Sequence, residues 1–186
     1  MSQRRYVRTL ATCLGLVCAM SGTNASRLAA QLTGPPVQYW HENVPGVWDD
    51  AVQNDHFGST LATGDFNGDG VDDLAIGVSN AQVGFILGAG AVHVLYGRTG
   101  TALFPLGQYW YQNLITGATN ERDDRFGSAL ASGDFDGDGF DDLAIGSPGE
   151  RIDGYGWAGQ VQVLFGSSSG LSNSPRAQLW HQDMPG

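Results

Sequence analysis

The feature of this sequence that most constrains its fold is a repeat of about seventy residues. Residues 64–77, GDFNGDGVDDLAIG, return at residues 133–146 as GDFDGDGFDDLAIG, with two changes in fourteen positions. The copies also share longer flanking matches, at 55–70 and 124–139, at 90–97 and 159–166, and in the tripeptides QYW (38–40 and 108–110) and QLW (178–180). Such a period indicates that one structural unit is built twice.

Each copy predicts four short strands separated by turn residues. In the first copy we expect these strands at residues 57–63, 73–78, 91–96 and 108–111. In the third of them, apolar residues recur with the period of two that places side chains on one face of a sheet. Beyond the first 25 residues, no window has the apolar stripe of a helix. Because four antiparallel strands are typical of one β-propeller blade, the predicted fold class is all-β.

The Phe-Gly pairs at 57–58 and 126–127, the acidic loops that follow them and Gly146-Ser147-Pro148 resemble FG-GAP repeats, the blades of the integrin α-subunit propeller. The resemblance covers roughly residues 37–182. The first copy departs from the pattern, with Gly77-Val78-Ser79 at the Gly-Ala-Pro element. The resemblance implies two four-stranded blades, which cannot close a ring of ~4–8 blades. We therefore expect an incomplete propeller, either completed by other copies of the chain or truncated.

Residues 1–25 are typical of a secretory signal peptide. Three arginines precede an uncharged run at residues 10–20, and small residues then predict cleavage after Ala25. The run is shorter than the ~20 residues that cross a bilayer, and the sequence leaves the Sec and twin-arginine routes open. Cys13 and Cys18 fall in this segment, so the mature chain cannot form a disulfide.

The repeat also sets the expected domain boundaries. After the signal peptide we expect a linker at 26–36, an orphan outer strand with its connecting loop at 37–56, a first blade at 57–112, an inter-blade loop at 113–125, a second blade at 126–182 and the start of a further repeat at 183–186.

The loop between the first two strands of each copy has the pattern D-x-[DN]-x-D-G-x-x-D. Calcium takes roughly 6–8 oxygen ligands, and this loop offers side-chain oxygens at positions one, three, five and nine and a carbonyl at position seven. The predicted ligands are Asp65, Asn67, Asp69, Val71 and Asp73 in the first loop, and Asp134, Asp136, Asp138, Phe140 and Asp142 in the second. The sequence therefore predicts two Ca²⁺ sites, the second tighter because it has one more carboxylate.

Other readings of these loops fit less well. An EF-hand needs a glutamate at position twelve, where this chain has Ile76 and Ile145. Magnesium prefers to keep several waters, and zinc calls for His or Cys ligands. The remaining alternative is a solvated acidic turn, which the mutual repulsion of the carboxylates disfavours. Asp72 and Asp141, at position eight, are expected to face solvent or cap the following strand.

The composition argues against two kinds of partner and gives no sign of catalysis. Lysine is absent, and nine arginines face nineteen acidic residues, which disfavours nucleic acid and anionic membranes. We find no Ser-His-Asp set, nucleophile elbow or zinc site. The carboxylates that might serve a glycosidase all belong to the acidic loops. His93, replaced by Gln162 in the second copy, is expected to point to solvent. We therefore expect no enzyme.

The copies differ most at residues 79–89 and 147–158, where a rigid scaffold would carry its function. The first of these segments is apolar and expected to pack between blades. The second offers a candidate ligand-binding set, with packing as the alternative role for its aromatic members: Arg151, Asp153, Tyr155 and Trp157.

The resemblance implies a secreted, periplasmic or surface-exposed calcium-binding protein that serves adhesion. Its expected partner is a protein or glycan at the cell surface, with a homo-oligomer as a further possibility. The alternatives are an accessory carbohydrate-binding domain of a secreted hydrolase, or a propeller fragment without independent function.

Overall fold

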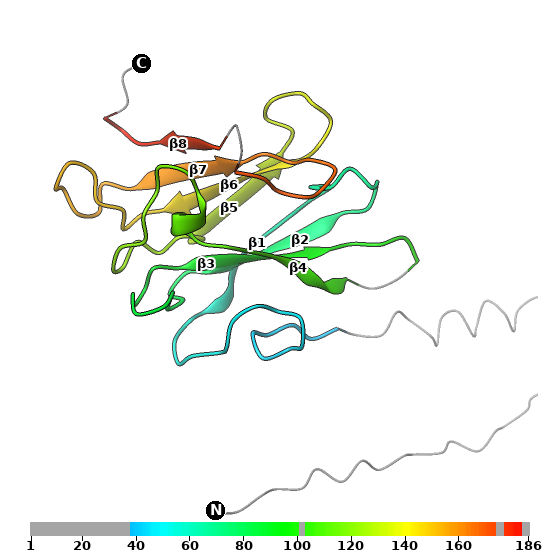
Figure 1. The fold of residues 1–186 in the computed structure, drawn as a ribbon, viewed down its shortest axis with the longest axis horizontal. Coiled ribbons are helices and arrows are strands. Elements are labelled where there is room, and N and C mark those ends of the chain that lie inside the picture. Colours follow the sequence, from blue (N-terminus) through cyan, green and yellow to red (C-terminus); the bar gives the residue numbers. More distant parts are fainter. Residues whose placement is uncertain (1–37, 101–102, 174–176, 184–186) are drawn as a thin grey trace, which may run out of the picture. The chain divides into compact units, whose positions relative to one another are not determined.

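The computed structural model describes residues 38–100, 103–173 and 177–183, which form two four-stranded antiparallel sheets in succession (Figure 1). The first sheet consists of β1 (Phe57–Gly64), β2 (Asp73–Val78), β3 (Ala91–Tyr96) and β4 (Phe104–Trp110). The second consists of β5 (Ala129–Gly133), β6 (Asp142–Ser147), β7 (Gln160–Leu164) and β8 (Gln178–Trp180). The predicted all-β class with two four-stranded blades is confirmed.

Helical structure contributes little to the described residues. A 3-10 turn, η1 (Gln112–Leu114), follows β4 and begins the connection to the second sheet. In this part of the chain, no helix has the length and apolar character needed to cross a membrane.

The two blades repeat the same strand register. In the first blade Ile76 lies opposite Leu61 on one side and His93 on the other. In the second blade, Ile145 takes the equivalent place between β5 and β7. Because register follows the alternation of side chains across a sheet, the repeated sequence gives both blades the same pairing of their second and third strands.

Residues 38–56 differ from the expectation of an orphan strand. They form turns and bends, and no described strand pairs with them in a ladder. The segment instead contacts β4: the Trp48 indole N–H donates to the Gly107 carbonyl (3.4 Å), and the Tyr109 hydroxyl donates to Asp49 (2.8 Å). The expected signal peptide and linker lie outside the described residues, as do residues 184–186.

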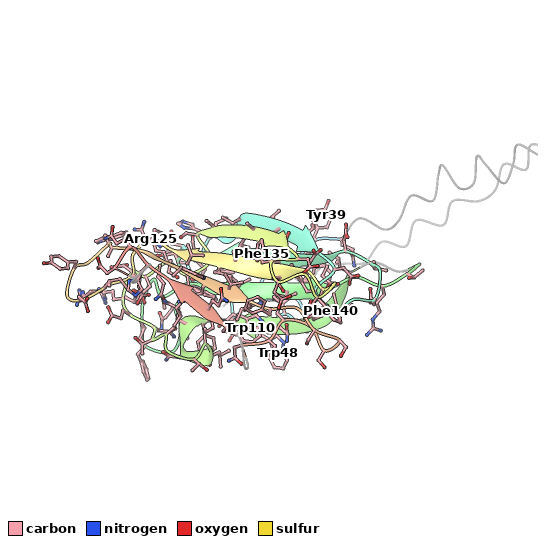
Figure 2. All side chains as sticks on the ribbon, turned by 90° about the horizontal axis from the view of Figure 1, so that it is seen from above. Tyr39, Trp48, Trp110, Arg125, Phe135 and Phe140 are labelled. Carbon is pink, nitrogen blue, oxygen red and sulfur yellow. The ribbon has the colours of Figure 1, made fainter. Side chains whose placement is uncertain are left out.

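The hydrophobic core lies between the blades, where β1 runs beside β5 (Figure 1). Val92 and Trp110 of the first blade and Phe126 and Leu143 of the second belong to one buried cluster. The acidic loops lie at one end of the strands and the 149–158 connection at the other. Figure 2 shows Phe140 of the second acidic loop and Arg125, which contacts that connection, at opposite ends of the view.

Candidate metal centre and neighbouring sites

The second acidic loop, between β5 and β6, gathers three carboxylates. Oxygens of Asp134, Asp136 and Asp138 lie within 4.8 Å of one another, and all three side chains are exposed. The chain wraps around Asp134, whose carboxylate accepts hydrogen bonds from the backbone amides of Asp138 (3.1 Å) and Gly139 (3.1 Å). The loop therefore gathers three carboxylates, whose oxygens are the ligand type that hard divalent cations take.

The first acidic loop, between β1 and β2, has the same internal hydrogen bonds. The Asp65 carboxylate accepts from the amides of Asp69 (3.0 Å) and Gly70 (2.8 Å), and the Asn67 side chain also accepts from Asp69 (2.9 Å). Gly70 has a φ of +81°, a conformation that favours glycine. The acidic sequence pattern therefore forms a closed, hydrogen-bonded turn in both copies.

The aspartates at position nine are placed differently from the other predicted ligands. Asp73 is buried, and its two oxygens accept from the amides of Phe66 (3.0 Å) and Gly97 (2.8 Å). Asp142 accepts in the same way from Phe135 and Gly166 (both 2.8 Å). Burial raises the pKa of Asp73 to about 6 and also raises that of Asp142. These carboxylates fasten the loop to the end of the third strand, a role that sequence reasoning missed.

Asp141 joins the two blades, contrary to the expectation that it faces solvent or caps a strand. Its carboxylate accepts from the Asp65 amide (2.8 Å), and its own amide donates to the Asp65 carbonyl (3.1 Å). The Phe140 ring lies directly over Gly68 of the first loop, where an added Cβ would be 2.5 Å away. The two acidic loops are therefore in contact across the blade interface.

The predicted ligand-binding residues share one exposed connection, but the structure does not bring them into one pocket. Arg151 lines a groove of about 380 Å³ together with Phe85 and Arg122. Trp157 instead packs under Arg125, whose guanidinium carbon lies 4.8 Å from the ring centroid. This distance fits a cation–π contact, so packing accounts for part of the role of Trp157. Asp153 and Tyr155 extend into solvent.

His93 is buried, which corrects the expectation that it points to solvent. Its ring lies 4.7 Å from that of Tyr109 and 5.6 Å from that of Phe57. Burial lowers the pKa of His93 to about 4, so the imidazole is neutral at physiological pH. Strand β3 is buried along almost its whole length, on both faces of the sheet. A side chain at this position therefore has no solvent-exposed face to point to, whichever way the strand alternates.

Two buried glutamates were missed by sequence reasoning, Glu42 in the segment before the first blade and Glu150 in the 149–158 connection of the second. Glu150 accepts from the Gln112 side chain, and burial raises its pKa to about 7. Burial raises the pKa of Glu42 to about 7 as well. In the repeat alignment, the replacement of Glu42 by Gln112 and of Ala81 by Glu150 was the available sequence signal.

Fold and loops together define the chain as a pair of β-propeller blades with acidic turns. It belongs to the FG-GAP repeat proteins, because residues 57–95 and 126–164 each match the FG-GAP repeat. Integrin alpha-3 of Cricetulus griseus is 35% identical over 137 residues, which cover 70% of this chain and 11% of that protein. Integrin alpha-PS5 of Drosophila melanogaster is 29% identical over 126 residues, covering 67% of this chain and 11% of the relative.

A second class of relatives carries the name of an enzyme. Phosphatidylinositol-glycan-specific phospholipase D of Bos taurus is 33% identical over 129 residues, which cover 68% of this chain and 15% of that protein. The chain therefore spans about 11 to 15% of the length of these curated relatives.

Proposed function

We propose that the chain is an exported, calcium-binding and non-catalytic module that binds a protein at the cell surface. The observation that carries the calcium part is the convergence of the Asp134, Asp136 and Asp138 carboxylates within 4.8 Å. Three negative charges so close together repel one another unless a cation offsets them. The similarity to integrin alpha chains supports the surface-binding part.

Each acidic loop would hold one Ca²⁺ through oxygen ligands. The proposed ligands are Asp65, Asn67, Asp69, the Val71 carbonyl and Asp73 in the first loop, and Asp134, Asp136, Asp138, the Phe140 carbonyl and Asp142 in the second. Bound calcium would supply charge neutralisation, while the chain itself provides the turn and its backbone hydrogen bonds. Because Asp73 and Asp142 already accept two amide hydrogen bonds each, we infer that they bind the ion with their remaining lone pairs.

Isothermal titration calorimetry with CaCl₂ tests this proposal directly. We expect two sites in the natural chain and one in Asp134→Asn, with the tighter site lost. The matched control is Asp153→Asn, an exposed aspartate outside both loops, which should keep two sites. Absence of calcium binding to the folded natural chain would refute the metal assignment.

The 149–158 connection is the proposed recognition surface for a protein partner. Arg151 and Tyr155 offer a charge and an aromatic ring on an exposed loop that rigid strands hold on both sides. A non-catalytic role is supported by the burial of His93, which removes this imidazole from any substrate. Cell-surface binding that is lost in Tyr155→Ala but retained in Phe85→Ala would agree with the proposal. Binding that both variants retain would refute this surface.

A second candidate is an accessory domain of a secreted hydrolase, favoured by the similarity to phosphatidylinositol-glycan-specific phospholipase D. In that case the aromatic residues of the same connection would bind carbohydrate. Glycan-array binding that depends on Trp157 would favour this candidate, and binding to a protein alone would favour the first. Hydrolysis of a phosphatidylinositol-glycan by the chain itself would overturn the non-catalytic role.

Export is tested by expression of the full chain and N-terminal sequencing of the product. Cleavage after Ala25 and recovery outside the cytoplasm would support it, and an intact Met1 terminus in the cytoplasm would refute it.

A further inference from the structure

One face of the second blade carries an open groove of about 470 Å³. The strands of the second blade and their borders supply its lining, which includes Ala129, Gly146, Gly159, Val161 and Trp180. The residues at the same places in the first copy are Thr60, Gly77, Gly90, Val92 and Trp110. We call the surface that these five positions form on either blade the slot.

In the first blade, the slot is filled by the backbone of Phe126-Gly127. An added Cβ on Gly77 would lie 2.3 Å from the Gly127 carbonyl oxygen, and one on Gly90 would lie 2.2 Å from the Phe126 carbonyl oxygen. The Thr60 hydroxyl donates to the Gly127 carbonyl (2.6 Å). The two glycines of this slot are therefore required by the close approach of another backbone.

In the second blade the slot keeps its glycines, and none of the residues that the structure describes fills it. An added Cβ on Gly146 would meet nothing closer than the Ala129 Cβ at 3.2 Å, and one on Gly159 would find its nearest atoms on Pro148 at 3.7 Å. Apolar residues that are buried in the first copy are exposed at the equivalent positions of the second. The exposed fraction rises from 0% at Phe66 to 52% at Phe135, from 0% at Val92 to 43% at Val161, and from 9% at Trp110 to 54% at Trp180.

The first blade presents a Phe-Gly segment of the shape that the slot accepts. Gly58 has a φ of +82° and Gly127 one of +84°, and the residues just before the Phe, His56 and Arg125, have φ values of 64° and 58°. We call residues 56–58 the plug. These φ values match those of the segment that fills the first slot, and Phe57 also pairs with Val78 at the start of β1.

A matched pair of aspartates lies in the acidic loops, at the other end of the strands from the plug and the slot. In the joint within the chain, Asp141 exchanges two hydrogen bonds with the backbone of Asp65. The equivalent residues are Asp72 of the first acidic loop and Asp134 of the second, and both are exposed. A blade seated in the open slot would place Asp72 against the Asp134 backbone and repeat this joint.

We propose that the open slot binds the plug of a second copy of this chain, head to tail. The inference does not depend on the proposed function. Plug and slot are different surfaces, so the contact is heterologous and can extend into a ring or a linear assembly. Two substitutions make it weaker than the joint within the chain. Ala129 lacks the hydroxyl of Thr60, and beside the slot Trp157 replaces Gly88, which lies close to Asp123 in the joint within the chain.

Sedimentation velocity of the full chain at constant calcium, over a hundredfold range of protein concentration, tests the proposal. The mass should rise with concentration. Val161→Arg places a charge in an exposed part of the slot and should weaken association at least tenfold. Asp72→Arg should do the same from the blade that carries the plug. The control Phe85→Arg changes an exposed apolar residue outside both surfaces and should associate like the natural chain.

A mixture of the two variants gives the sharper result. The Val161→Arg chain keeps its plug and the Asp72→Arg chain keeps its slot, so an equimolar mixture should form a dimer and nothing larger. Circular dichroism establishes that each variant is folded, and Gly146→Val provides a second slot variant. A natural chain that stays monomeric at every concentration would overturn the proposal. So would slot variants that associate like the control, or a mixture that grows beyond two copies.

Discussion

The buried carboxyl group of Glu150 provides the strongest quantitative test of the structure. Its ordinary pKa of 4.5 is raised to about 7, first by burial and then by the nearby charges of Asp124 and Glu121. The Gln112 amide donates to it and lowers the pKa, but only in part. Ionising Glu150 therefore costs the folded state free energy that the unfolded chain does not lose.

The direction of the effect follows from proton binding. Between pH 4.5 and about 7 the folded state holds a proton on Glu150 that the unfolded state has lost. The contribution of this group to stability is therefore full below pH 4.5 and falls as the pH rises to about 7. Each pKa unit corresponds to about 1.4 kcal/mol, so the loss of unfolding free energy is at most about 3 kcal/mol. Solvent relaxation around the charged group reduces this loss.

We therefore expect Glu150→Gln to stabilise the protein by about 2 kcal/mol above pH 7 and to have almost no effect near pH 4.5. The new amide keeps an oxygen that can accept from Gln112. It also adds a donor for the Gln112 side-chain oxygen, which is buried without a partner among the described residues. Urea unfolding followed by tryptophan fluorescence, at constant calcium and several pH values, measures the difference between the two chains.

The control is Asp153→Asn, which removes a charge from an exposed position of the same connection. Surface changes of this kind usually stay within about 0.5 kcal/mol. If Glu150→Gln were destabilising at pH 8, or if its effect did not change with pH, the burial and ionisation argument would be wrong.

The remaining predictions concern the blade interface and the acidic loops. Phe126→Ala should lower the unfolding free energy by about 3–5 kcal/mol, because it empties a buried position between the blades, and urea unfolding measures it. Gly77→Ala should destabilise by roughly 1–3 kcal/mol or more through contact with the Gly127 carbonyl, whereas the equivalent Gly146→Ala, in the open slot, should cost less in the same assay. Asp136→Asn should weaken calcium binding by the second loop, and calorimetry should then show two sites of similar affinity.

Much of the fold could be predicted because the same strand and turn pattern occurs in both copies of the repeat. β2 and β3 begin and end at the predicted residues, since each is a run of strand-forming residues bounded by turns. β4 begins earlier than expected, at Phe104. Proline in a central strand would remove a ladder hydrogen bond, but β4 lies at the edge of its sheet, where Pro105 is tolerated.

The acidic loops were predictable for a related reason: their geometry is local. The hydrogen bonds around Asp65 and Asp134 span at most five residues, so spacing alone determines which atoms meet. The roles of Asp141, His93 and Glu150 depend on residues far away in the chain. Asp141 contacts Asp65, which lies 76 positions earlier. No local pattern in a single copy contains that information.

The contact between Asp65 and Asp141 links the conformation of the first acidic loop to the packing of the two blades. The Asp65 side chain holds the turn of the first loop, and its backbone holds the second blade. An interaction that fixes Asp65, such as bound calcium, therefore stabilises both the turn and the interface. It follows that the first loop should influence the stability of the whole blade pair. The second loop, where Asp134 is the equivalent of Asp65 but no further blade is described beside it, should influence its own blade until a partner is bound.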